Sequence, residues 1–363
     1  MENKRRFVIL VLLLACTVCP FGALAQKIEG KITVPVPEKE DSTYIKSFRN
    51  HFTVYTFLSR KYTSIKQPGA PGIPAFRYLP NNTYSVGLGF AYRYYSLSLG
   101  IGLQSLNRDK DLRGETRLLD LQTNIYTRKW IVDLSAQFYK GYYLSNKGFV
   151  PQQENYWLAP DLRLRLLGGS AYYVLNHKNF SFRASNALNE WQQKTSGSLL
   201  LGLEAYMGIV KNEQGLVPRP LRNTYPQGAV NRVGFTQIGP GIGYSQLFVF
   251  RQHFFASLTG TLNPVFGFTQ ERSDLAKEKK VYLFSNYNLR ATFGYFAPKW
   301  SGSLAWAHTN LFIKGSANNR PYQIQTGSIR LMIAYRFLPG NKTRQLFQLP
   351  DPYVEKVMPL QNN

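Results

Sequence analysis

The sequence predicts an all-β protein, a single transmembrane antiparallel β-barrel of 12–14 strands that follows an N-terminal signal peptide. Apolar and polar residues alternate with a period of two from about His51 to Phe337, and the last of these segments ends in an aromatic residue. Side chains on a strand point to opposite faces in turn, so such strands can form a wall between lipid and water. A mean hydropathy of -0.27 fits a barrel, because half of each strand faces a polar interior.

The first 25 residues have the pattern of a secretion signal. A basic segment (residues 4–6) and an apolar segment (7–15) precede a small-x-small site at residues 23–25, which predicts cleavage between Ala25 and Gln26. Residues 13–16 also resemble a lipoprotein cleavage box with Cys16 as the lipidated residue, and this second interpretation stays open. Because both cysteines lie in this segment, the mature chain would have no disulfide and no cysteine metal site.

Three further segments are expected after the signal: a periplasmic linker (26–50), the outer-membrane barrel (51–337) and a periplasmic tail (338–363). The predicted strands are 51–62, 83–93, 95–105, 116–127, 130–142, 160–175, 179–188, 197–210, 233–249, 253–268, 281–297, 299–313 and 322–337. Closed bacterial barrels have even strand numbers, and thirteen segments conflict with that rule. A hidden strand near Leu216 to Tyr225 would give fourteen, which we favour; if 179–188 or 197–210 is not a separate strand, the count is twelve.

Short and long connections alternate along the barrel segment, as in outer-membrane barrels of Gram-negative bacteria, whose periplasmic turns are tight. Aromatic rings flank the short turns and predict an aromatic girdle on the periplasmic side. Its expected members are Tyr92, Tyr95, Tyr126, Trp130, Tyr172, Phe180, Phe248, Phe254, Tyr295 and Trp300. The final strand, with its terminal Phe337, resembles the signal that the outer-membrane assembly machinery recognises, so that machinery is an expected partner during biogenesis.

The chain carries a formal net charge of +24. Such a surplus attracts anions, and for a secreted barrel the expected partners are outer-membrane lipid and lipopolysaccharide. Nucleic acid is not expected, because the sequence contains none of the known nucleic-acid-binding motifs. No cofactor is expected either, since none of the four histidines stands at metal-ligand spacing from another histidine or a carboxylate.

Six short segments occur in a characteristic order: Asp41–Ile45, Leu58–Tyr62, Leu79–Asn81, the glycine pair Gly87 and Gly89, Gln193–Gly202, and Gly239–Tyr244. Together they resemble a family of outer-membrane β-barrels known as domain of unknown function 4421, over about residues 41–337. The resemblance implies a barrel fold and an outer-membrane location. Because the family has no assigned activity, it implies no functional residue.

Charged side chains on the polar faces of the strands are the strongest candidates for a functional site. The expected lumen-facing charges are Arg93, Arg163, Arg165, Arg183, Arg290, Arg330, Arg336, Asp120, Asp133, Asp161 and Glu204. Paired with each other they would plug a small barrel, because an unpaired buried charge is costly. With arginines left unpaired they would line a narrow passive pore that prefers anions.

We therefore expect a structural or partner-binding barrel with a largely plugged, arginine-rich lumen. The anion pore is the first alternative, and a lipid-modifying enzyme is the second. An enzyme is not favoured, because no serine elbow and no fixed histidine partner marks a nucleophile. The strand glycines also fail to form a phosphate loop, since no helix follows them; glycine within a strand more often marks a bend or a close approach.

Overall fold

The computed structural model describes residues 43–48, 51–82, 84–92, 95–103 and 109–340. The predicted signal peptide, most of the linker and most of the C-terminal tail lie outside the described residues. Within the described part of the chain, no helix is long and apolar enough to cross a bilayer.

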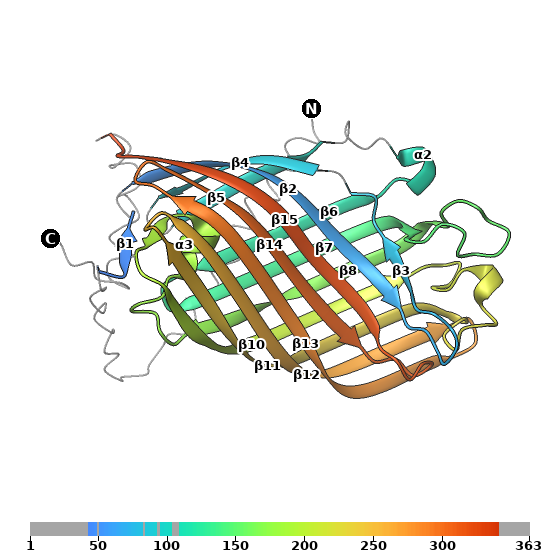
Figure 1. Ribbon diagram of the computed structural model, residues 1–363. Helices are drawn as coiled ribbons and strands as arrows, with labels where there is room; N and C mark the ends of the chain where they lie inside the picture. Colours follow the sequence, from blue (N-terminus) through green and yellow to red (C-terminus); the bar gives the residue numbers. More distant parts are fainter. Residues whose placement is uncertain (1–42, 49–50, 83, 93–94, 104–108, 341–363) are drawn as a thin grey trace, which may run out of the picture. The chain divides into compact units, whose positions relative to one another are not determined.

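Among the described residues, thirteen strands form one antiparallel sheet (Figure 1). They are β2 (Phe52–Gln67), β3 (Phe76–Leu79), β4 (Tyr84–Tyr92), β5 (Tyr95–Gly102), β6 (Arg117–Tyr126), β7 (Trp130–Leu144), β8 (Leu158–Val174), β10 (Ser196–Lys211), β11 (Val230–Phe250), β12 (Phe254–Ser273), β13 (Lys277–Phe296), β14 (Trp300–Ile313) and β15 (Tyr322–Phe337). The predicted antiparallel barrel is confirmed. The thirteen strands of the sheet fall within the expected range of 12–14, but the closed ring itself has ten strands.

The sheet closes on itself because its last strand pairs with its first. β15 pairs with β2 from Gln323↔Lys66 to Phe337↔Phe52. The short strand β3 joins β2 to β7, so that ten strands form a closed ring. The β4–β5 hairpin is attached to β2, and β6 is attached to β7. The fold is therefore a closed antiparallel barrel.

The alternation in the sequence has a direct structural counterpart. In β12, for example, Val265 is buried inside the barrel while its neighbours Phe266 and Phe268 are exposed on the outside. Exposed leucine, isoleucine and phenylalanine side chains recur in the same way on the other long strands. An apolar outer surface of this kind is what a lipid-facing barrel wall requires.

Two segments differ from the predicted strands. Residues 179–188 do not add a strand to the wall; they contain helix α3 (Phe182–Ala187), whose N-terminus is capped by the Ser181 hydroxyl accepting from the Ala184 amide. The next element in the chain, β9 (Glu190–Gln192), pairs with β1 (Ile45–Ser47) in a two-stranded ribbon. The second segment, 216–225, holds the 3-10 helix η2 (Arg219–Leu221) and no strand. The prediction of a fourteenth strand there was therefore wrong. Apart from 179–188, the twelve other predicted segments are strands.

Candidate functional site: the barrel lumen

The barrel has two different ends. At the short-turn end, tight connections join β6 to β7, β11 to β12 and β13 to β14. Most connections at the long-loop end are longer, although residues 274–276 alone join β12 to β13, and the β5–β6 connection carries helix α2 (Lys110–Arg113). β2 begins at Phe52 and β15 ends at Phe337, and these two paired residues lie at the short-turn end.

Helix α3 fills the lumen at the short-turn end. Phe180, Phe182, Ala184 and Leu188 are buried in one apolar cluster with inward-facing side chains of the surrounding wall. The wall residues of this cluster are Phe57, Ile131, Tyr172, Val174, Leu200, Leu247, Phe255, Phe296, Met332 and Ala334. Because these belong to eight different strands, the helix packs within the barrel, and we call residues 176–195 the plug segment; Figure 1 shows α3 at the same end as β1.

Glu190 anchors the plug segment. Its buried carboxylate lies 3.6 Å from the Arg128 guanidinium and 3.3 Å from that of Arg183, and it also accepts a hydrogen bond from the Ser181 hydroxyl. Arg128 belongs to the β6–β7 turn, so this ion-pair cluster ties the plug segment to the wall.

Arg336 forms a second anchor from the last strand. Its buried guanidinium donates to the carbonyl oxygens of Leu188 and Ala297 and to the Ser301 hydroxyl, and it lies 4.1 Å from the Phe48 ring. Arg336 thus connects the end of α3 to the β13–β14 turn.

An ion pair crosses the lumen above the plug segment. Arg290 on β13 contacts the Asp133 carboxylate on β7, and the Tyr126 hydroxyl donates to Asp133 at 2.8 Å and accepts from Arg290 at 3.0 Å. The Arg290 guanidinium also lies 5.7 Å from the Phe182 ring of α3. Four strands separate β7 from β13 along this side of the wall, so the pair bridges the interior.

This bridge yields a test by a double-mutant cycle. Arg290→Ala should lower the free energy of unfolding by about 1–3 kcal/mol, less than for a fully buried pair, because the two side chains are 25% and 18% exposed. Asp133→Ala should cost a similar amount, and the double variant should cost clearly less than the two together. Urea unfolding in detergent measures all three; strictly additive losses would contradict the pairing.

A polar network fills the middle of the lumen around the buried carboxylate of Glu204. It accepts from the side-chain amides of Asn263 at 2.9 Å, Asn286 at 2.7 Å and Asn288 at 2.9 Å. Glu204 is on β10 and the three asparagines are on β12 and β13. The carboxylate is therefore held by neutral donors, as a buried charge requires.

Two of the strand glycines make room for this network. The Tyr172 hydroxyl donates to the Asn263 side-chain oxygen at 2.5 Å, and its ring lies across the intervening strands. A Cβ atom at Gly202 would come within 2.6 Å of the Tyr172 ring, and one at Gly241 within 2.8 Å of it. Their role is thus close approach, as expected for glycine within strands.

Apolar packing closes the long-loop end. Inward-facing residues such as Ile65, Leu164 and Val233 form a second cluster with Leu216 and Val217 of the β10–β11 loop. The three loops above it are hydrogen-bonded to one another: Gln227 donates to the Pro68 carbonyl at 2.7 Å, and Asn318 donates to Gln227 at 2.7 Å.

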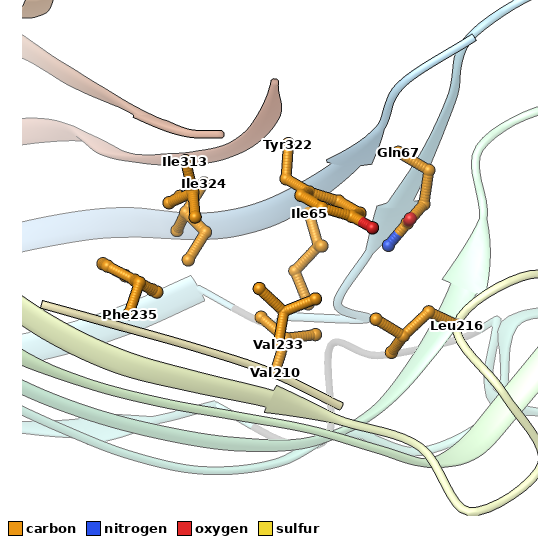
Figure 2. Close-up of a pocket in the computed structure, with 9 residues that line it drawn as sticks. All are labelled: Ile65, Gln67, Val210, Leu216, Val233, Phe235, Ile313, Tyr322 and Ile324. Atoms are coloured by element: carbon orange, nitrogen blue, oxygen red, sulfur yellow. The ribbon is translucent and has the colours of Figure 1, made fainter. Parts of the chain in front are cut away.

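A small pocket remains beneath these loops (Figure 2). Its lining is almost wholly apolar and comprises Ile65, Gln67, Val210, Leu216, Val233, Phe235, Ile313, Tyr322 and Ile324. Gln67 is the polar exception: it is buried, and neither its amide nitrogen nor its amide oxygen bonds to another described residue. The buried side chains of the long-loop half are thus mainly apolar. The buried Glu271 carboxylate there accepts from the Tyr322 hydroxyl at 2.6 Å and from the Ala317 amide at 2.8 Å.

The structure places the expected lumen charges in three groups. Asp120, Asp133, Glu204, Arg290, Arg330 and Arg336 point inward, and Arg183 lies in the plug segment. Asp120 pairs with Lys61 at 3.0 Å, and Arg330 lies 4.9 Å from the Phe57 ring. Arg93 is outside the described residues.

Three of the expected lumen charges are on the other face. In β8 the buried, inward residues are Leu162, Leu164 and Leu166, so Asp161, Arg163 and Arg165 point outward. The Lys140–Asp161 ion pair, with side chains 44% and 43% exposed, lies on this outer surface. The prediction failed here because β8 extends to the long-loop end, where the inside of the barrel is apolar and its outside is polar.

The expected aromatic girdle divides in a similar way. Trp130, Phe248, Phe254, Tyr295 and Trp300 are exposed on the outer surface near the short-turn end. Tyr126 and Tyr172 instead point into the lumen and Phe180 belongs to the plug segment, which corrects their assignment to the girdle. Tyr92 is buried at the short-turn end, where its ring centroid lies 6.0 Å from that of Phe52. The Tyr95 side chain is outside the described part of the structure.

His308 has no catalytic surroundings in the described part of the chain. Its Nδ1 atom lies 2.9 Å from the Tyr62 hydroxyl, and its ring stacks on Trp306 with centroids 5.9 Å apart. Among the described hydrogen bonds neither a serine nor a carboxylate contacts it, so His308 is not part of a Ser–His–carboxylate triad within the described residues.

Comparison with known proteins adds the family but no activity. Similar solved structures include the outer-membrane protease OmpT from Escherichia coli (10% identity, 80% of this chain and 98% of that chain covered, TM-score 0.38). Others are the Neisserial surface protein A (7% identity, 79% and 97% covered, TM-score 0.20) and the toluene transporter TodX of P. putida (8% identity, 80% and 91% covered, TM-score 0.28). No curated protein matches the sequence significantly.

The family model described as domain of unknown function DUF4421 matches residues 39–337, which include every strand of the closed sheet. That match covers well over half of the chain and agrees with the resemblance that the sequence segments indicate. The chain therefore belongs to the family described as domain of unknown function DUF4421.

Proposed function

We propose that this protein is a structural or partner-binding barrel of the outer membrane whose lumen is plugged, and not a passive pore. The observation that carries the proposal is the position of α3, which packs inside the wall at the short-turn end. A passive pore would need an open, water-filled path through this end.

The pairing of the lumen charges supports the same proposal. An anion-preferring pore needs arginines with free guanidinium groups along a water-filled path. Here Arg290 is paired with Asp133, Arg183 with Glu190, and the Arg336 guanidinium is enclosed by carbonyl and hydroxyl oxygens. The protein would therefore act through its exposed loops and outer surface, without catalysing a reaction.

Single-channel recording of the purified mature protein in planar bilayers, with a salt gradient, tests the proposal. We expect folded protein, identified by its heat-modifiable mobility on gels, to insert and remain silent. Arg330→Ala should also be silent, because Arg330 would not line a conducting path. Steady, anion-selective steps from the wild-type protein, reduced in selectivity by Arg330→Ala, would instead establish the pore.

A further inference from the structure

The outer surface at the long-loop end carries an ordered row of basic residues. Seven consecutive strands, β6 to β8 and β10 to β13, each place one lysine or arginine directly opposite that of the next strand. The pairs are Arg117↔Lys140, Lys140↔Arg163, Arg163↔Lys211, Lys211↔Arg232, Arg232↔Arg272 and Arg272↔Lys277. We call these seven residues the basic row.

All seven side chains of the basic row point away from the lumen. Residues directly opposite each other in a sheet share a face, and on each strand the adjacent buried residues define the inward side. On β11, for instance, Val233 is buried next to Arg232; on β12, Glu271 is buried next to Arg272.

An apolar row runs parallel to the basic row, four residues closer to the short-turn end. Each of its residues again lies directly opposite that of the next strand, and only one of them, Thr236, is polar. The apolar row consists of Leu121, Ala136, Leu167, Met207, Thr236, Phe268 and Val281. Four residues span about 13 Å along a strand. The basic row thus begins where the lipid-facing surface ends, at the level of lipid headgroups.

Few carboxylates compensate the positive charge of the basic row. Lys140 pairs with Asp161 at 3.3 Å and Lys211 with Glu213 at 3.5 Å, both on exposed side chains. The other five members have no ion pair within the described residues, and Arg165 and Lys279 add two more positive charges between the two rows. Like charges directly opposite each other destabilise a sheet, so an anion that lies across the seven residues would stabilise it.

We propose that the basic row is a binding site for the phosphate groups of lipopolysaccharide, whose acyl chains would lie on the apolar row. A phosphorylated lipid fits both rows at once: its phosphates neutralise the arginine and lysine charges, and its acyl chains cover the leucine, methionine and phenylalanine side chains below. Arginine binds phosphate through paired N–H donors, and four of the seven residues are arginines.

The test is binding of lipopolysaccharide to the full-length protein in neutral detergent, for wild type and for the triple variant Arg163→Gln, Arg232→Gln, Arg272→Gln. We expect the variant to bind on the order of 10- to 100-fold more weakly. Removal of the phosphates from the lipid should weaken binding to the wild-type protein to a similar degree, and should change binding to the variant little.

A matched control removes three basic residues from the short-turn end: Lys129→Gln, Arg251→Gln, Lys299→Gln. This variant has the same net charge as the first, so it should bind like wild type if the basic row is the site. Equal weakening in both variants would reduce the effect to net charge and overturn the proposal. Wild-type binding that ignores the lipid phosphates would overturn it as well; heat-modifiable mobility verifies that each variant is folded.

Discussion

Glu190→Ala is expected to release the plug segment and to lower the free energy of unfolding by about 3–5 kcal/mol. The substitution removes the carboxylate shared by Arg128 and Arg183, whose side chains are 15% and 16% exposed. Without it, the largely buried Arg183 guanidinium would lose its ion-pair partner, and the Ser181 hydroxyl would lose its acceptor. Water would enter the short-turn end most readily, because the plug segment is held there.

Urea unfolding measures the loss of stability, and planar-bilayer recording measures whether the loosened plug segment admits ions. Asp161→Ala is the matched control, since it removes a carboxylate from an exposed ion pair that contributes no more than about 1 kcal/mol. If Glu190→Ala unfolds at the wild-type urea concentration and stays silent, Glu190 does not anchor the plug segment.

The wall of the barrel could be predicted from the sequence because period-two alternation is a local property. Each long strand alternates over enough residues to be recognised by itself, as in β12 and β13. The plug segment was missed for the same reason. Phe180, Phe182 and Ala184 also follow a period of two, and all three are buried, so the pattern fits an inward-packed segment as well as a strand. A signal that favours the helix is the capping residue Ser181.

Alternation reveals which residues share a face, but it does not reveal which face is inside. The prediction assumed polar residues inside and apolar residues outside, and within the bilayer this holds for Glu204 and Arg290. At the long-loop end the strands of this barrel reverse the pattern, because the lumen there is an apolar core and the outside is wet. Arg163 and Arg165 were misplaced for this reason.

The partners of the lumen charges depend on register, which the sequence does not contain. Asp133 meets Arg290 across 157 residues of chain, and Glu204 meets Asn286 across 82. The basic row likewise cannot be recognised from the sequence, because members such as Lys211 and Arg232 come together only when β10 and β11 pair. Sequence reasoning could find the charges, but only the closed sheet shows that some are compensated and others are not.

Glu204→Ala is expected to destabilise the barrel by about 3–5 kcal/mol, although the residue is far from either end of the lumen. Its carboxylate is the acceptor for three asparagine amides, and Asn286 donates to no other described acceptor. Glu204→Gln keeps the shape but places an amide nitrogen among amide donors, so it should cost about 1–3 kcal/mol. The expected order of stability is therefore wild type, then Gln, then Ala.

The same urea titration tests this order, with Glu213→Ala as the control. Glu213 is a glutamate too, but its side chain is 66% exposed and pairs with Lys211 on the surface. Its loss should change the free energy of unfolding by less than about 1 kcal/mol. If Glu204→Ala is no worse than Glu213→Ala, the amides are satisfied by water in the lumen. Because a wet lumen would also weaken the case for a plugged barrel, this comparison tests the middle of the lumen independently of the plug segment.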